Sequence, residues 1–326
     1  MSAYKMDMVQ FKAALTELMK QYTVVAPAME DNRLVYAEIR DVSHIVLDNQ
    51  LPYKSPKEVV FPRIEHMMRF LEDKVEDAQE IKPVLLIGAK PCDVAAMKIF
   101  DEIFTGDRGK FKDSFYKNRR NCLTVIGMAC QEKKPGCFCD ERGTDLWFSP
   151  DCDGFLNLAD GGLVYEPLTE KGAGLFPGIE AEPVRPGGGL EEILVIQAEE
   201  ADVFITMPWE TYTEGCIGCG TCTYICPTCH CFNLRDAEQK GTVTRTRVWD
   251  SCMYPNFTLH AGGHNPRTRK YERFRQRVLH KYLYILKNYG YTACTGCGRC
   301  IRSCPGGLNI RNTVSDISKR LKEVQK

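Results

Sequence analysis

Two stretches of the sequence share one cysteine pattern: CIGCGTCTYICP at residues 216–227 and CTGCGRCIRSCP at residues 294–305. In each run, two-residue gaps separate the first three cysteines, three residues precede the fourth, and a proline follows it. Glycines relax the short gaps, so that a tight loop brings three sulfur atoms to one site, while the proline ends the loop and turns the fourth cysteine away. The fourth cysteine of each run is therefore expected to reach the other site.

This spacing is the ligand pattern of two-cluster bacterial ferredoxins. Zinc explains it less well, because zinc knuckles need neither a third cysteine at the same gap nor the Cys-Pro ending. One [4Fe-4S] cluster is expected on Cys216, Cys219, Cys222 and Cys304. The second [4Fe-4S] cluster is expected on Cys294, Cys297, Cys300 and Cys226.

The chain has 326 residues, which favours two domains. Residues 1–207 alternate short apolar runs with helical patterns, as in VLLIG (84–88) followed by DVAAMKIFDEIF (93–104), and predict an α/β domain. Its 150–190 segment is rich in Gly and Pro and predicts loops and short strands, and EEILVIQ and ADVFITM (191–207) are expected as its last strands.

Residues 208–326 predict a mainly α-helical, ferredoxin-type domain with two clusters. The 67 residues between Cys226 and Cys294 exceed the compact spacing of a small ferredoxin and include an amphipathic helix within 267–290.

A third group of cysteines lies in the predicted α/β domain. Cys92 and Cys130 each follow an apolar strand pattern, and Cys137 and Cys139 stand in PGCFCD. If both strands belong to one parallel sheet, their thiols emerge at its carboxyl edge, where α/β sheets place ligands. We expect these four cysteines to hold a third [4Fe-4S] cluster; the alternative is four separate buried thiols. Asp93 is either a substitute ligand or a helix cap.

The cysteine content indicates a reducing compartment. All 17 cysteines belong to a chain whose N-terminus has no apolar signal region and predicts an amphipathic helix, so a cytoplasmic protein is expected. No apolar run approaches 18 residues, so no transmembrane segment is expected.

Residues 206–326 hold 19 Lys and Arg against 8 Asp and Glu, a net charge of about +11, and residues 1–205 carry about −11. This basic excess fits a part of the chain that houses anionic cofactors.

No motif for hydride transfer, phosphate binding or a nucleophilic serine stands in the expected context, which favours electron transfer without catalysis by this chain.

The stripe Arg267–Lys281, with seven basic residues, is either a solvated helix face or a docking surface for an acidic partner. Nucleic-acid binding is not expected, because no binding motif accompanies the charge. Cys229, Cys231 and Cys252 either pack beside a cluster, supply it with hydrogen bonds, or ligate an extra centre.

Several segments together resemble a family of iron–sulfur electron-transfer subunits, and the likeness covers roughly residues 80–310. The segments are GAKPCDVAAMKIF, PGCFC, CIGCGTCTYICPTCHCF, WDSCMYPNFTLHAGGHNPR, RVLHKY and CTGCGRCIRSCP. The family is typified by the beta subunit of sulfhydrogenase, the iron–sulfur subunit of anaerobic sulfite reductase, and the corresponding subunit of flavin oxidoreductases that partner heterodisulfide reductase. Its members often continue the CFC segment with Ser-Met-Gly, whereas this chain has CFCDERGTD.

The resemblance implies an electron relay in a multisubunit complex of anaerobic metabolism. One partner would be a flavoprotein that handles NAD(P)H and carries the flavin and NAD(P), and the other a terminal hydrogenase, sulfite reductase or heterodisulfide reductase subunit. The alternative is an enzyme that reduces a small substrate directly at an open or extra cluster.

Overall fold

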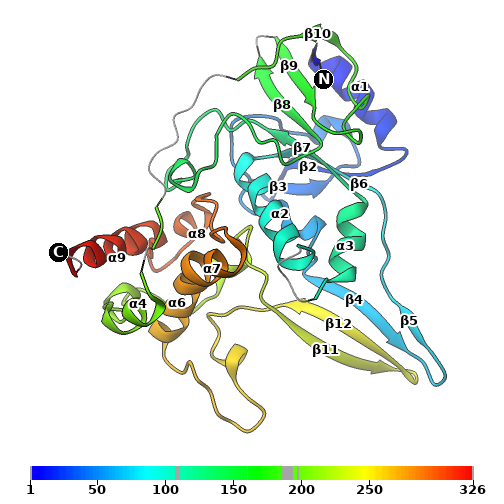
Figure 1. The fold of residues 1–326 in the computed structure, drawn as a ribbon. Helices are drawn as coiled ribbons and strands as arrows, with labels where there is room; N and C mark the ends of the chain where they lie inside the picture. The colour runs from blue at the N-terminus through cyan, green and yellow to red at the C-terminus, as the bar shows by residue number, and fades with distance from the viewer. Residues whose placement is uncertain (1, 107–110, 160, 186–193, 197, 325–326) are drawn as a thin grey trace. The chain divides into compact units, whose positions relative to one another are not determined.

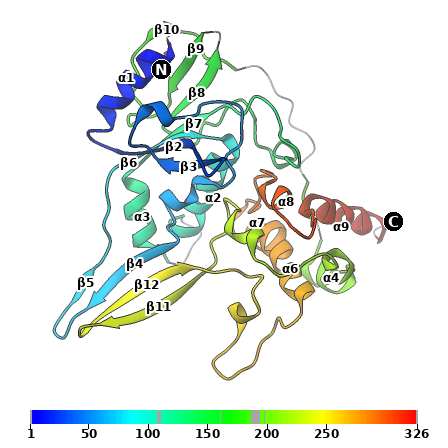
Figure 2. The ribbon, with the colours of Figure 1, turned by 180° about the vertical axis from the view of Figure 1, so that it is seen from behind.

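The computed structural model describes residues 2–106, 111–159, 161–185, 194–196 and 198–324, and the chain divides into two compact units (Figures 1 and 2). Unit 1 comprises Met1–Phe61, Glu80–Lys134 and Gly143–Glu191. Unit 2 comprises Pro62–Gln79, Pro135–Arg142 and Glu192–Lys326. Unit 2 thus takes in three segments that precede residue 208 in addition to the predicted C-terminal domain. The expected mixture of helix and strand is confirmed.

Unit 1 is built on an eight-stranded sheet in the order β10-β1-β9-β8-β7-β6-β2-β3. The four strands β2, β6, β7 and β8 pair in parallel, and the outer strands pair antiparallel. The strands are β1 (Ala3–Met6), β2 (Thr23–Glu30), β3 (Arg33–Glu38), β6 (Val84–Ala89), β7 (Leu123–Met128), β8 (Gly154–Ala159), β9 (Gly162–Pro167) and β10 (Ile179–Ala181). The central strands are nearly continuous apolar runs, as expected for parallel strands that are covered on both faces.

Helices connect and cover this sheet. They are α1 (Met8–Leu18), α2 (Pro91–Phe104) and α3 (Ser114–Asn121), with short 3₁₀ turns at Val42–His44 and Pro56–Val59. Asp7 and Gln10 form a capping box at the start of α1, with the Gln10 backbone amide donating to the Asp7 carboxylate at 2.7 Å. Phe11 and Leu15 of α1 pack into the core with Ile87.

The predicted carboxyl-edge placement holds for two of the cysteines. The expected strands before Cys92 and Cys130 are β6 and β7, which pair in parallel. Both thiols lie just beyond the strand ends and are buried. Helix α2 begins at Pro91 with Lys90 as its N-cap, so Asp93 lies in the first turn and is not the cap that the sequence suggests.

Unit 2 contains a second sheet made of two hairpins, in the order β11-β12-β4-β5 and antiparallel throughout. Its strands are β4 (Ile64–Phe70), β5 (Val75–Asp77), β11 (Phe232–Gln239) and β12 (Thr242–Trp249). Lys240 and Gly241 connect β11 to β12 with positive φ angles of 52° and 77°, the backbone of a tight two-residue hairpin turn.

The rest of unit 2 is helical. Its helices are α4 (Glu200–Thr206), α5 (Thr221–Tyr224), α6 (Lys270–Leu279), α7 (Ile285–Tyr289), α8 (Arg299–Arg302) and α9 (Ile310–Val324), with 3₁₀ turns at Asp140–Arg142, Thr211–Thr213 and Pro255–Thr258. A π-helical turn, His280–Tyr284, joins α6 to α7. Phe274 and Val278 of α6 pack with Val314 and Ile317 of α9 in the apolar core of this unit.

Two sequence predictions differ from the structure. The predicted strand at residues 201–207 falls instead on α4 and its C-cap, and Val203 enters the helical core, because a short apolar run fits either element and its packing decides. The other strand predicted there, at 191–197, lies largely outside the described residues. The region between the cysteine runs is predicted to be mostly helical, yet it also contains the β11–β12 hairpin. The alternating sequence TVTRTRVW, rich in β-branched residues, accounts for β12.

The sequence predicts no transmembrane segment, and the helices of the structure can be compared with that prediction. Across the ranges that the structure describes, no helix has both the length and the apolar character needed to cross a lipid bilayer.

A buried ion pair joins two strands of the second sheet and generates a stability prediction. Glu65 of β4 stands directly opposite Arg247 of β12, with Nε and Oε2 2.7 Å apart and both residues at most 3% exposed. Glu65→Ala removes one charge and leaves the other buried, so we expect a loss of about 3–5 kcal/mol in the free energy of unfolding. Anoxic denaturant unfolding of the holo-protein measures it.

The same sheet provides a matched control. Asp236 and Arg245 also stand opposite each other and form a pair at 2.7 Å, but both side chains are exposed to solvent. Asp236→Ala should therefore cost no more than about 1 kcal/mol. Equal, small losses in the two variants would contradict the assignment of Glu65 and Arg247 as a buried pair.

Candidate metal centres

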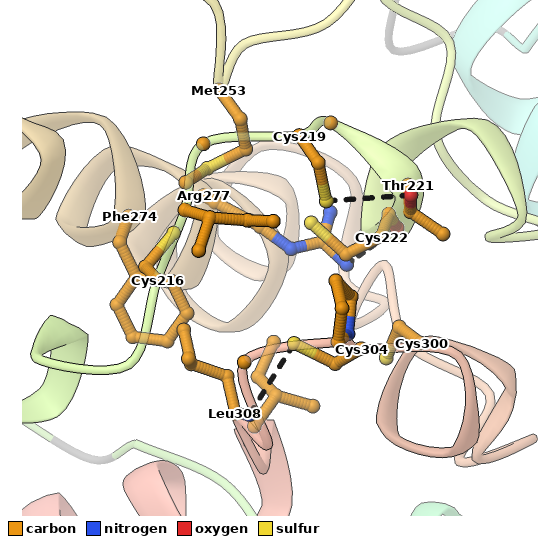
Figure 3. Close-up of a pocket in the computed structure, with 16 residues that line it drawn as sticks. Cys216, Cys219, Thr221, Cys222, Met253, Phe274, Arg277, Cys300, Cys304 and Leu308 are labelled. Carbon is orange, nitrogen blue, oxygen red and sulfur yellow. Dashed lines mark hydrogen bonds between the residues drawn. The ribbon is translucent and has the colours of Figure 1, made fainter.

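Both cysteine runs contribute to a first cavity in unit 2 (Figure 3). Cys216, Cys219 and Cys222 line it from the loop before α5 and from α5 itself, and Cys304 lines it from the turn after α8. The remaining wall is largely apolar and includes Met253, Phe274, Leu308 and Ile310. Sulfur is therefore the main donor atom that this cavity offers to a bound group.

A second cavity has the reciprocal composition. Cys294, Cys297 and Cys300 of the second run line it together with Cys226, the last cysteine of the first run. Cys226 and Cys297 are buried. The structure thus brings together the two sets of four that the sequence analysis names. Cys300 borders both cavities, so the two sites adjoin each other.

Glycines shape the loop of the second run. Gly296 and Gly298 have φ angles of +64° and +67°, which side chains rarely allow. A Cβ atom at Gly296 would lie 2.4 Å from the Phe138 carbonyl oxygen, and the Phe138 amide donates to the Gly296 carbonyl at 2.8 Å. The chain around Phe138 therefore packs directly on this loop, and no residue with a side chain fits at either glycine.

Within the part of the chain that the structure describes, no group of three or more His, Cys, Asp or Glu side chains is arranged to hold one ion. A cubane spreads its thiolates over four different irons, so its ligands lie farther apart than those of zinc. The two cavities fit the larger group better.

The third predicted set is divided between the units. Cys92 and Cys130 belong to unit 1, whereas Cys137 and Cys139 belong to unit 2. Cys137 lies beside the second run, because its thiol donates to the Cys297 carbonyl at 3.4 Å and its sulfur accepts from Arg302 at 3.4 Å. The third cluster on these four residues stays a prediction.

Arg277 of α6 lines both cavities. It is only 3% exposed and donates to the Cys229 sulfur at 3.2 Å and to the Cys222 carbonyl at 2.9 Å. Burial lowers the pKa of this guanidinium, but the surrounding cysteines, Cys222 and Cys229 foremost, together raise it by more, so the net pKa lies well above its ordinary value. The side chain therefore remains a cation inside the protein.

Lys281 lies in the π-helical turn and lines only the second cavity. Its ammonium, also 3% exposed, lies 3.4 Å from the Cys226 sulfur and donates to Thr228 Oγ1 at 2.8 Å and to the Ala293 carbonyl at 2.7 Å. Burial lowers the pKa of this ammonium, but the neighbouring cysteines, chiefly Cys226 and Cys229, together raise it by more. The net pKa is therefore above the ordinary value. π-helical turns are frequent at functional sites.

These contacts correct the predicted basic stripe for three of its seven basic residues, whereas Arg269 and Lys270 are exposed. Arg273, Arg277 and Lys281 are buried, and Arg273 donates to the carbonyls of Met253, Arg267 and Thr268. They do not form a solvated or docking face, because their long side chains turn inward to carbonyl and sulfur acceptors. Sequence reasoning missed them as site residues. Their available signal was the four-residue spacing on a helix between the two cysteine runs.

The three cysteines left open by the sequence lie among the thiols and cations. The Cys229 thiol donates to Cys226 and, with Lys281 and Arg277, holds the pKa of Cys226 well below its ordinary value despite burial. The thiol and amide of Cys252 donate to the Cys231 sulfur and lower its pKa to about 6. Cys229 thus supplies a hydrogen bond to a predicted ligand, and Cys231 and Cys252 form a pair.

Two further cysteines lie elsewhere. The apolar run after Cys122 suggests a core position, but Cys122 is exposed at the end of α3, because the strand begins only after it. Cys152 is buried in unit 1 and donates to backbone carbonyls, and burial raises its pKa to about 12. Burial therefore keeps this thiol neutral.

Comparisons with known proteins agree with these sites. Residues 215–308 match the family model described as a 4Fe-4S dicluster domain, a span that contains both cavity-lining runs. The beta subunit of sulfhydrogenase 2 from Pyrococcus furiosus is 28% identical over 329 aligned residues, covering 91% of this chain and 93% of that subunit. No solved structure matches the chain. The chain therefore contains a 4Fe-4S dicluster domain and is similar, along most of its length, to a sulfhydrogenase beta subunit.

Proposed function

We propose that this chain is the iron–sulfur relay of a multisubunit oxidoreductase. It would pass electrons between a flavoprotein subunit that handles NAD(P)H and a terminal subunit of hydrogenase, sulfite reductase or heterodisulfide reductase type. The observation that carries the proposal is the pair of adjoining cavities, each lined by one predicted set of four cysteines, with Arg277 in the wall of both. A single site would hold an electron, whereas two neighbouring sites allow it to move through the protein.

The ligand sets proposed for the two cavities are crossed. Cys304 completes the set of the first run, and Cys226 completes the set of the second. A [4Fe-4S] cluster supplies a one-electron couple whose potential the protein adjusts. The chain's own part is to hold four thiolates, to exclude water with apolar walls, and to place buried cations near the added negative charge.

A third cluster is proposed on Cys92, Cys130, Cys137 and Cys139, of which Cys92 and Cys130 emerge together at the carboxyl edge of the unit 1 sheet. The flavin and NAD(P) are proposed to reside on a partner, because the sequence lacks a dinucleotide-binding motif. A cytoplasmic location is proposed from the many reduced thiols.

Replacement of Cys226 tests the crossed ligands. In Cys226→Ser, we expect damage to the cluster held mainly by Cys294, Cys297 and Cys300, because the lost thiolate lines their cavity. Electron paramagnetic resonance of the reduced holo-protein should lose or shift one of two cluster signals, and iron should fall by up to about four atoms per chain.

Cys122→Ser is the matched control, since Cys122 is exposed and lies in unit 1. It should leave iron content and both signals unchanged. The signal of each centre can be identified from Cys219→Ser, which affects only the first set. Damage in Cys226→Ser that coincides with that of Cys219→Ser would overturn the crossed assignment.

The relay role predicts how the isolated chain behaves. Anoxically purified chain should accept electrons from dithionite or a reduced viologen, yet oxidise neither NADH nor NADPH. Turnover with NAD(P)H should appear only when a flavoprotein partner co-purifies from the source cells. The role is wrong if the chain alone binds flavin and oxidises NAD(P)H, or if it is purified without iron and inorganic sulfide.

A further inference from the structure

The cations around the two cavities are distributed unequally. Arg277 lines both cavities, whereas Lys281 lines only the second, with its ammonium 3.4 Å from the Cys226 sulfur. Both side chains are buried in unit 2. Among the described residues, the wall of the first cavity thus includes one buried cation, Arg277, and the wall of the second includes two, Arg277 and Lys281.

Two more arginines contact the second run. The Arg142 guanidinium donates to the Cys294 carbonyl at 3.3 Å, and Arg302 donates to the Cys297 carbonyl at 3.1 Å. Glu141, the described carboxylate beside Arg142 in sequence, is engaged by Arg311 at 2.7 Å. On the first run, Lys270 donates to the Cys216 carbonyl at 2.7 Å, but Lys270 is exposed and its charge is screened by solvent.

Reduction of a cluster adds one negative charge, so a nearby cation favours the reduced state and raises the potential. Solvent acts in the same direction and favours the first site, where Cys219 is exposed. A buried ammonium in contact with a ligand sulfur acts through a medium of low effective dielectric constant, where one charge has more influence than partial hydration. The cations therefore decide the order of the two sites.

We propose that Lys281 makes the second centre the more oxidising of the two, so that an electron arriving at the Cys216–Cys219–Cys222–Cys304 site moves on to the Cys226–Cys294–Cys297–Cys300 site. Arg277 raises both potentials together, and Lys281 sets their difference. This inference rests on the proposed function, since it requires both centres. Lys281 and Arg277 act as positioning residues for charge and make no bond to iron.

The test is a redox titration of the anoxic holo-protein, followed by electron paramagnetic resonance. Signals are assigned with Cys219→Ser for the first centre and Cys226→Ser for the second. In the wild type, the second centre should have the higher midpoint potential. Lys281→Met should lower only that midpoint, and the two centres should approach each other or exchange order. Arg277→Met should lower both midpoints, and Arg277→Lys should restore them in part.

Lys270→Met is the matched control and should change neither midpoint, because it removes a lysine contact to the first run at an exposed position. Lys281→Gln gives the same comparison if Lys281→Met loses iron, since glutamine can still donate to Thr228 or Ala293. Iron and sulfide are measured in every variant, so a structural defect is distinguished from a change in potential.

The outcomes separate this inference from the proposed function. Wild-type protein without two clusters would refute the proposed function. Two intact clusters with the first centre at the higher potential would overturn the inference alone. The inference also fails if Lys281→Met and Lys281→Gln keep full iron and leave the second midpoint unchanged, or if they lower both midpoints equally.

Discussion

The structure of unit 2 depends on two cysteine runs that cannot complete their cavities alone. Each run lines its own cavity with three cysteines and places its fourth cysteine in the wall of the other, and Cys300 borders both. The geometric cause is the proline after the fourth cysteine, which ends the loop. Because the runs are 67 residues apart, the chain between them has to fold back before either set of four exists. The helix from α6 to α7 belongs to that return path and brings Arg277 to both cavities.

The net charge of the second part of the chain has a structural explanation. From the sequence alone, Arg273, Arg277 and Lys281 would be taken for surface charges. In the structure their side chains are buried. They meet backbone carbonyls and cysteine sulfurs. The two cations nearest the cavities, Arg277 and Lys281, have raised pKa values because the surrounding cysteines together outweigh the effect of burial. Eight cysteines line the two cavities, and part of the positive charge around them comes from a single helix.

How much of the structure can be predicted depends on the range of the interaction. The strands before Cys92 and Cys130 and the helix after Cys92 follow from local patterns, and the structure has them at the expected places. The cavity sets follow from spacing alone. Residues 201–206 cannot be assigned from sequence, because a short apolar run fits a strand or a helix and the packing of Val203 decides. The burial of Arg277 and Lys281 cannot be predicted from the sequence either, because an amphipathic pattern assigns basic residues to the solvent side of a helix. Their partners are sulfurs about fifty residues away in sequence.

The close approach of Phe138 to Gly296 has a consequence for how the molecule can be divided. Residues 135–142 come from a distant part of the chain, yet they cover the backbone of the second cysteine loop and hydrogen-bond to it. A fragment cut at residue 208 would carry all eight dicluster cysteines but would leave that loop bare toward oxygen and water. The segment that contains the two cysteine runs is thus not a self-contained domain. A design that moves it into another protein would have to include residues 135–142 as well.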